Sequence, residues 1–146
     1  MRISSKCRYG MAAMISIALS DVECVTIISI SEKLGISKIY LEQVFSLLKR
    51  AGLVNSIKGA QGGYQLAISP EKITVGEIMR ASETSLFEHT ENSVSEKAEE
   101  IDKALNVAVW SKLDEALALT LNDVTLSDLC AEVKRQKHGN DMMFYI

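Results

Sequence analysis

The sequence predicts a mainly α-helical fold with one small β-hairpin and a long helix in its second half. Three observations predict it. Apolar residues recur at spacings of three and four in several segments, a glycine-rich turn separates two short strand-like runs, and the chain contains a single proline. Apolar residues make up 47% of the 146 positions and aromatic residues only 5%, which is typical of helices packed through aliphatic side chains.

Two short helices joined at a glycine are predicted between residues 29 and 50. Ser29 is expected to cap the first helix and Gly35 to end it, because glycine readily adopts the left-handed conformation that closes a helix. Ser37 is expected to cap the second helix. The apolar stripe of this second helix consists of Leu41, Val44, Phe45 and Leu48.

A basic, glycine-rich hairpin follows the second helix. The turn at residues 58–63 separates the alternating run 53–57 from the short run 64–66. Helix, glycine turn, helix and hairpin, in this order, is the layout of a winged helix-turn-helix, which reads DNA. A nucleotide-phosphate loop is the alternative for such a turn. It needs Lys-Ser/Thr after its last glycine, whereas Gly63 leads into a strand.

Further caps mark the other helices. Ser4 or Ser5 is expected to begin a first helix, and residues 21–26 to connect it to the next. Thr74 and Glu77 have the spacing of a capping box, in which each residue bonds the main chain of the other.

The second half of the chain is predicted to hold a long helix and a short one. Ser95 is expected to cap a helix that runs to about Leu121, and Thr125 a last short helix with Asp128 at the box position. The apolar face of the long helix is wider than its own domain requires. This width favours a partner helix from a second copy of the chain.

We therefore expect four parts along the chain. They are a winged helix-turn-helix domain at residues 1–82, a linker at 83–94, dimerisation helices at 95–133 and a C-terminal tail at 134–146.

The net charge of −3 hides a strong asymmetry between the two halves. Residues 1–80 carry ten Lys or Arg against six Asp or Glu, a net +4, and residues 81–146 carry six against thirteen, a net −7. Attraction to phosphates acts within a Debye length of about 10 Å, so the local charge matters more than the total. The first half therefore suits double-stranded DNA, and the second half suits dimerisation or regulation.

The predicted DNA contacts fall into three groups. The exposed side chains of the second helix are expected to read bases: Ser37, Lys38, Tyr40, Glu42 and Gln43. Gln43 suits an adenine edge and Glu42 suits the amino group of cytosine. The wing residues expected near DNA are Lys58, Gly59, Gln61, Gly62 and Gly63, whose glycines allow main-chain amides to approach phosphates. Backbone contacts are expected from Arg2, Lys6, Arg8, Lys49 and Arg50.

Several function classes receive no support from the sequence. No run of 18 apolar residues predicts a membrane span, and no cleavage site predicts a signal peptide, so we expect a cytoplasmic protein. No nucleophile–base pair or carboxylate pair predicts an enzyme. Cys7, Cys24 and Cys130 are too widely spaced for a metal site or a disulfide framework. Cys24, in an exposed loop, is a candidate redox sensor, although the acidic neighbour Glu23 disfavours its thiolate.

Several motifs together resemble one known family. They lie at residues 1–6, 8–9, 35–37, 40–43, 51–54, 59–64 and 73–78. In this order they resemble the Rrf-two family of bacterial winged-helix regulators, which includes IscR, NsrR and CymR. The resemblance implies a homodimer, joined through the long helix, that binds palindromic promoter DNA. It supports DNA roles for Glu42, Gln43 and Lys58, although many members carry arginine where this chain has Lys58, and Cys7 replaces a usual glycine.

The resemblance also bears on the cofactor. The IscR and NsrR branches hold an iron–sulfur cluster on three cysteines in the loop before the long helix. This chain has no cysteine between Cys24 and Cys130, so we expect no cluster and no cofactor. His89 in that loop is expected to be a surface residue. The resemblance is therefore closest to the cluster-free CymR-like branch, and it implies a repressor of cysteine or sulfur genes.

The last residues suggest a protein partner. CymR-like regulators end in a similar Phe-Tyr-Ile, which implies that Phe144, Tyr145 and Ile146 dock into O-acetylserine thiol-lyase. An apolar anchor with a free carboxylate is a natural ligand for an amino-acid site. The alternative is that Phe144 and Tyr145 fold back on the dimer core. A second hypothesis for the whole chain is a protein-interaction subunit whose tail regulates a metabolic enzyme.

Overall fold

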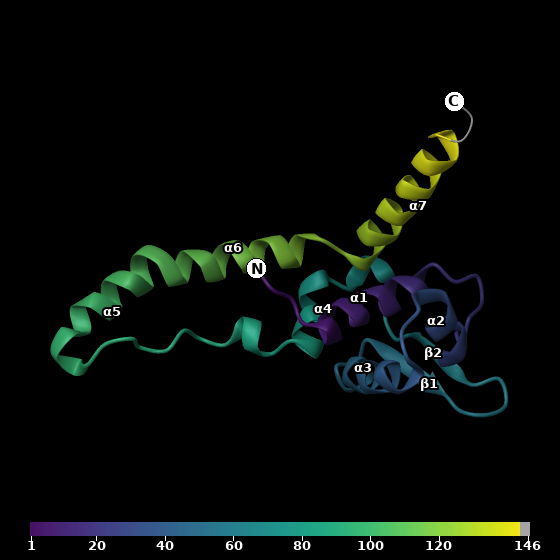
Figure 1. Cartoon of the computed structure of the whole chain (residues 1–146), viewed down its shortest axis with the longest axis horizontal. Coiled ribbons are helices and arrows are strands. Elements are labelled where there is room, and N and C mark those ends of the chain that lie inside the picture. The colour runs from purple at the N-terminus through teal and green to yellow at the C-terminus, as the bar shows by residue number, and fades with distance from the viewer. Residues whose placement is uncertain (144–146) are drawn as a thin grey trace.

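The computed structural model describes residues 1–143, which form a helical body with a small hairpin and two projecting helices (Figure 1). The helices are α1 (Ser5–Ala18), α2 (Ile27–Leu34), α3 (Lys38–Arg50), α4 (Val75–Ser82), α5 (Glu99–Leu105), α6 (Ser111–Asp123) and α7 (Leu126–Met143). The strands β1 (Val54–Ile57) and β2 (Gly63–Leu66) pair antiparallel, with Val54 opposite Leu66 and Ile57 opposite Gly63. The predicted mainly helical fold with a β-hairpin wing is confirmed.

The body consists of α1 to α4 and the hairpin, packed around one aliphatic core. Its fully buried side chains come from every helix of the body, among them Met14, Ile30, Leu41, Phe45 and Ile78. A second buried cluster joins Cys7 of α1 and Met79 of α4 to Leu121 of α6. This cluster attaches the base of the long helix to the body.

The helix-turn-helix forms largely as the sequence predicts. Gly35 ends α2 with φ at 66°, and the Ser37 hydroxyl accepts the Tyr40 N–H at 3.2 Å to begin α3. The predicted cap at Ser29 is wrong, because α2 begins earlier in the chain. The Thr26 hydroxyl accepts the Ser29 N–H at 3.1 Å, so Ser29 lies inside the first turn.

Two capping boxes meet where the body joins the last helix. Thr74 and Glu77 exchange the predicted bonds at 3.2 and 2.8 Å. Thr125 and Asp128 do the same at 3.1 and 2.9 Å. The threonines also form an isolated antiparallel bridge, which ties the start of α4 to the start of α7.

The arm, which we define as residues 99–123, leaves the body as one long rod (Figure 1). It contains α5, a single π-helical segment Asn106–Trp110, and α6. The predicted cap at Ser95 is wrong, since its side chain makes no capping bond. The main chain instead forms a 3-10 turn at Glu96–Ala98, with the Ala98 N–H bonded to the Ser95 carbonyl at 2.9 Å.

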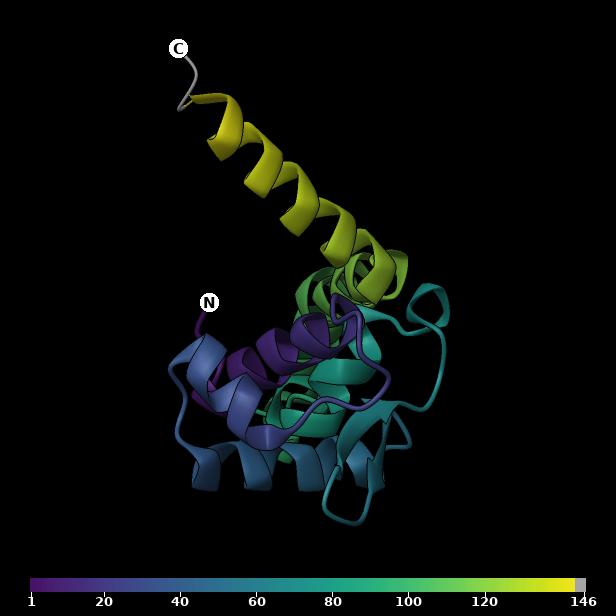
Figure 2. The same ribbon diagram turned by 90° about the vertical axis from the view of Figure 1, so that its right-hand side faces the viewer.

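The last helix is longer than the sequence predicts. Instead of a short helix to about residue 133, α7 continues to Met143 and rises away from the body (Figure 2). Lysine, arginine and glutamine are good helix formers, and Glu132 pairs with Arg135 at 2.6 Å. The predicted boundary between residues 133 and 134 therefore falls within a helix, and Phe144, Tyr145 and Ile146 lie outside the described residues.

No helix within residues 1–143 combines the length and the apolar character needed to cross a membrane.

A glycine pair offers a matched stability test. A Cβ at Gly63 would collide with the Val25 carbonyl, whereas a Cβ at Gly139 would meet nothing within 4 Å. We expect Gly63→Ala to lower the free energy of unfolding by about 2–3 kcal/mol, since the clash is with main chain. Gly139→Ala, inside α7, should cause no loss because alanine favours helix. Urea unfolding of both variants measures this, and equal stabilities would contradict the described packing of the hairpin.

Candidate nucleic-acid interface

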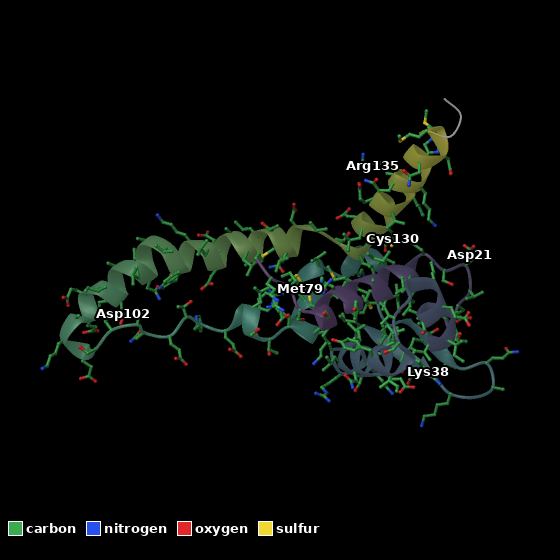
Figure 3. All side chains as sticks on the ribbon, viewed as in Figure 1. Asp21, Lys38, Met79, Asp102, Cys130 and Arg135 are labelled. Atoms are coloured by element: carbon green, nitrogen blue, oxygen red, sulfur yellow. The ribbon has the colours of Figure 1, made fainter. Side chains whose placement is uncertain are left out.

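The outer face of α3 is the first part of the interface. Lys38, Glu42 and Gln43, which the sequence predicts to read bases, are exposed on it. Figure 3 labels Lys38 at the start of this helix. The opposite face, with Leu41, is buried in the core. The helix therefore presents polar groups to a groove while its apolar stripe holds it in place.

Sequence reasoning missed Ile39 on the same face. Its side chain is 72% exposed, although isoleucine is usually buried. The signal was present, because Ile39 lies two residues before Leu41 and so falls outside the buried stripe. An exposed aliphatic group on a recognition helix can contact the methyl group of thymine.

Tyr40 differs from its neighbours on α3. It is half-buried and packs edge-to-face on Tyr9 of α1, with ring centroids 5.1 Å apart. This contact fixes the start of α3 against α1. Ser37 is exposed, and its hydroxyl is already bonded to the Tyr40 N–H.

The wing is the second part of the interface. Lys58, Gly59 and Gln61 are exposed at its tip, and Gly59 has φ at 118°, which other residues rarely adopt. The Gly62 N–H donates to the Gly59 carbonyl at 3.0 Å, so it closes the turn. Gly63 is required for the close approach to Val25.

Three interactions hold the wing beside α3. Tyr64 of β2 stacks on Phe45 of α3, with centroids 4.1 Å apart and planes 12° apart. Tyr64 also exchanges main-chain bonds of 2.8 and 2.9 Å with Val25. Lys49 of α3 donates to the Ser56 hydroxyl of β1 at 2.8 Å. As a result, α3 and the hairpin share the lower edge of the molecule in both views (Figures 1 and 2).

A cationic hollow lies next to the start of α3. Arg2, Lys6 and Arg8, predicted to contact the DNA backbone, line an open cavity of about 650 Å³ together with Tyr40. Arg50, at the other end of α3, is exposed but does not line this cavity. The cavity thus joins cations of the amino-terminal segment to the recognition helix, as phosphate contacts beside a groove require.

Glu83 is the acidic group of this cavity, and sequence reasoning missed it. Hydrogen bonds from Ser4 and Ser85 hold the pKa of its carboxyl below the ordinary range. The Ser4 N–H donates to Glu83 at 3.1 Å, and the Ser85 hydroxyl donates at 2.9 Å. Glu83 therefore ties the amino-terminal segment to the end of α4 while it stays ionised.

Comparison with known proteins identifies the family. Residues 3–132 match the model of the family Rrf2, described as iron-dependent transcriptional regulators. The chain belongs to the Rrf-two family. The HTH-type transcriptional regulator IscR of Klebsiella pneumoniae is 42% identical over 130 residues, 88% of this chain and 79% of that protein. IscR of Escherichia coli is 38% identical over 147 residues, 97% of this chain and 90% of that protein.

Solved Rrf-two structures share the fold. CymR, described as the global cysteine regulator of B. subtilis, superposes with a TM-score of 0.75 at 34% identity, over 90% of this chain and 98% of that one. IscR of T. potens superposes with a TM-score of 0.70 at 35% identity, over 91% of this chain and 88% of that one. This Rrf-two member is accordingly a winged-helix, DNA-binding transcriptional regulator.

The iron in the family description can be tested against this chain's donors. Within residues 1–143, no three His, Cys, Asp or Glu side chains converge in a way that could hold a metal ion. Burial raises the pKa of the Cys7 thiol on α1 and of the Cys130 thiol on α7. The donors that the structure describes therefore do not fit a three-cysteine iron site.

The cysteines should differ sharply in reactivity. Cys7 and Cys130 are buried, whereas Cys24 lies partly exposed in the connection between α1 and α2. We expect a maleimide reagent to label Cys24 at least about tenfold faster than the other two, because thiol reactivity follows access and thiolate character. Peptide mass spectrometry over a time course measures this. Equal labelling of Cys7 in the folded protein would contradict the described core.

Proposed function

We propose that this chain is a homodimeric, cluster-free repressor of cysteine or sulfur genes, which reads its operator with α3 and the wing. One observation carries the DNA-reading part. α3 and the wing lie along the same edge of the body (Figure 2), and the cationic hollow borders the start of α3 through Tyr40. The proposed base contacts come from Lys38, Glu42 and Gln43, with Ser37 and Tyr40 beside them.

The contacts around this surface support separate roles for its cations. Lys58 is exposed on the wing, where it can reach a phosphate or the adjacent minor groove. Lys49 is held by Ser56, so we assign it to the support of the wing as well as to the phosphate backbone. Arg2, Lys6, Arg8 and Arg50 contact phosphates, which supplies affinity without sequence preference.

The arm supports the homodimer. It carries exposed aliphatic side chains along its length, among them Ile101, Leu113 and Leu119. Exposed apolar surface of this extent is rare in a monomer and typical of an interface. A two-fold dimer also suits palindromic DNA, because each copy then reads one half-site. Bound at a promoter, the dimer would exclude RNA polymerase.

The donor set supports the cluster-free assignment. The relative named IscR from Klebsiella pneumoniae is 42% identical to this chain and CymR is 34% identical, so identity alone favours the IscR branch. The cysteines support the cluster-free branch instead, because Cys7, Cys24 and Cys130 lie on different elements and two of them are buried. The superposition on a regulator named for cysteine supports the proposed target genes.

Gel-shift titration with DNA from upstream of the chain's own gene tests DNA reading. Gln43→Ala should reduce the preference for operator over scrambled DNA by about 1–3 kcal/mol, because a bidentate base contact is lost. Lys58→Ala should weaken binding to both DNAs and reduce the salt slope by about 1. Lys97→Ala, an exposed lysine outside both the arm and the DNA-reading surface, is the matched control and should change nothing. Wild-type binding without sequence preference, or an equal effect of Lys97→Ala, would overturn the proposal.

Reconstitution with ferrous iron and sulfide under anaerobic conditions tests the cofactor. We expect no visible iron–sulfur absorbance and no stoichiometric iron, because the thiols do not converge. Operator binding should be unchanged by a chelator. A stable cluster that alters operator binding would show that the cluster-free assignment is wrong.

Cys24 is the proposed redox-responsive thiol, since it is the accessible one among the three cysteines. Another solved relative, CymR of Staphylococcus aureus, is described in an oxidised form.

A second candidate function concerns the tail. Residues 134–143 of α7 are exposed, and this end of the helix points away from the body (Figure 2), which favours a docking role over packing on the core. We propose that residues 144–146 bind O-acetylserine thiol-lyase. Deletion of these residues should abolish capture of that purified enzyme and leave operator binding unchanged. Asp141→Asn is the control and should bind normally. Undiminished capture by the deletion variant would exclude the tail as the docking element.

A further inference from the structure

The arm contains one wide helical turn near its centre. The Ser111 N–H donates to the carbonyl of Asn106, five residues earlier, where an α-helix would use the residue four earlier. The Ser111 hydroxyl also donates to the Asn106 side-chain oxygen at 2.7 Å. Residues five apart face different directions in an α-helix, so this side-chain bond requires the wide turn. Such π turns occur often at functional positions.

The wide turn changes which residues share a side of the arm. Ile101, Leu105, Val109 and Leu113 follow each other at intervals of four. With 3.6 residues per turn, the step from Ile101 to Leu113 would overshoot three turns by roughly 120° in a continuous α-helix. The π turn takes up one residue, which leaves about three whole turns. Ile101 and Leu113 therefore face the same side.

This row is unpartnered within the described chain. Ile101 is 48% exposed, Val109 37% and Leu113 58%. Figure 3 shows Asp102, the neighbour of Ile101 in the sequence, at the outer end of the arm and far from the body. Ala104 and Ala108, next to the row, are also exposed, and their small side chains allow close approach of another backbone.

We propose that the π turn sets the register of the dimer. The row packs antiparallel against the same row of a second copy, with the two-fold axis at Val109. This inference rests on the proposed homodimer. The row has the required symmetry, because Leu105 and Leu113 are equally far from Val109 and so pair with each other across the axis.

The charges of the arm support this register. An antiparallel pair centred on Val109 brings Lys103 level with Glu115 of the second copy. Asp102 and Asp114 come level with alanines, and Lys112 comes level with Asn106. No two like charges between residues 99 and 119 are then level, so this register avoids like charges that face each other directly.

Cysteine cross-linking tests the position of the axis. In a Cys24→Ser background, Val109→Cys should form a covalent dimer under mild oxidation, because each thiol meets its own copy. Val107→Cys is the matched control. Its side chain is 73% exposed but points to the opposite side of the arm, so it should stay largely monomeric. Equal or faster cross-linking through Val107, or none through Val109, overturns the register.

Two length variants test the π turn. Deletion of Ala108 removes the extra residue and keeps Ile101 aligned with Leu113, so the dimer dissociation constant should change by less than about threefold. An alanine inserted after Ala108 turns Ile101 by roughly 100° and should weaken the dimer about tenfold or more. Sedimentation equilibrium measures both. Equal weakening by the two variants, or by neither, overturns the proposed role. If the wild-type chain is monomeric, the proposed homodimer itself is wrong. If the wild type is dimeric but the variants give either contradictory result, only the proposed register is wrong.

Discussion

The stack of Tyr64 on Phe45 holds the DNA-reading surface together. A two-stranded hairpin is marginally stable by itself, so the wing needs support from the body. Phe45 belongs to α3 and is fully buried in the core of the body. The ring of Tyr64, on β2, stacks nearly parallel to the Phe45 ring. The same tyrosine bonds Val25 through its main chain, and Gly63 is the residue that lets the two backbones meet. These contacts hold the wing in a fixed position beside the recognition helix, which a groove-reading surface requires.

The same arrangement explains how an acidic chain binds DNA. The cations of the first half gather at the start of α1, on α3 and on the wing. Six of the thirteen acidic residues of the second half lie on the arm, which leads away from the hairpin (Figure 1). Because salt screens charges beyond about 10 Å, the arm does not cancel the local attraction. Among the acidic groups near the interface, Glu83 is held by Ser4 and Ser85, so its charge also supports the fold.

Most of the fold could be predicted from local rules. Ser37, Gly35 and the Thr74–Glu77 box occupy the predicted positions, because caps and left-handed glycines depend on neighbours within a few residues. The start of α2 is harder to predict. Thr26 and Ser29 are both good caps, and in the structure Thr26 is the cap, next to Ile27, which packs partly buried against the core. The length of α7 is equally hard to predict, because the mostly polar residues 134–143 are compatible with either helix or coil.

The sequence predicts which residues of the candidate site are exposed on α3, but it does not predict the contacts that hold the site together. The exposed Lys38, Glu42 and Gln43 follow from the buried stripe of α3. The contacts of Tyr40 with Tyr9, of Lys49 with Ser56 and of Ser4 with Glu83 join different elements of the fold, and no local pattern reveals them. The π turn was not predicted either. The apolar residues around it follow ordinary helical intervals of four, and the extra residue is evident only when the rotation is added up over three turns.

Two copies of the helix-and-wing surface are proposed to read DNA together, and this is the central claim. Selection of binding sites from a random pool of duplex DNA by the purified chain tests it most directly. The enriched sequence should contain two inverted half-sites whose centres lie about 10–10.5 base pairs, or a multiple of this, apart. Enrichment of a single unpaired half-site, or of no sequence, would contradict it.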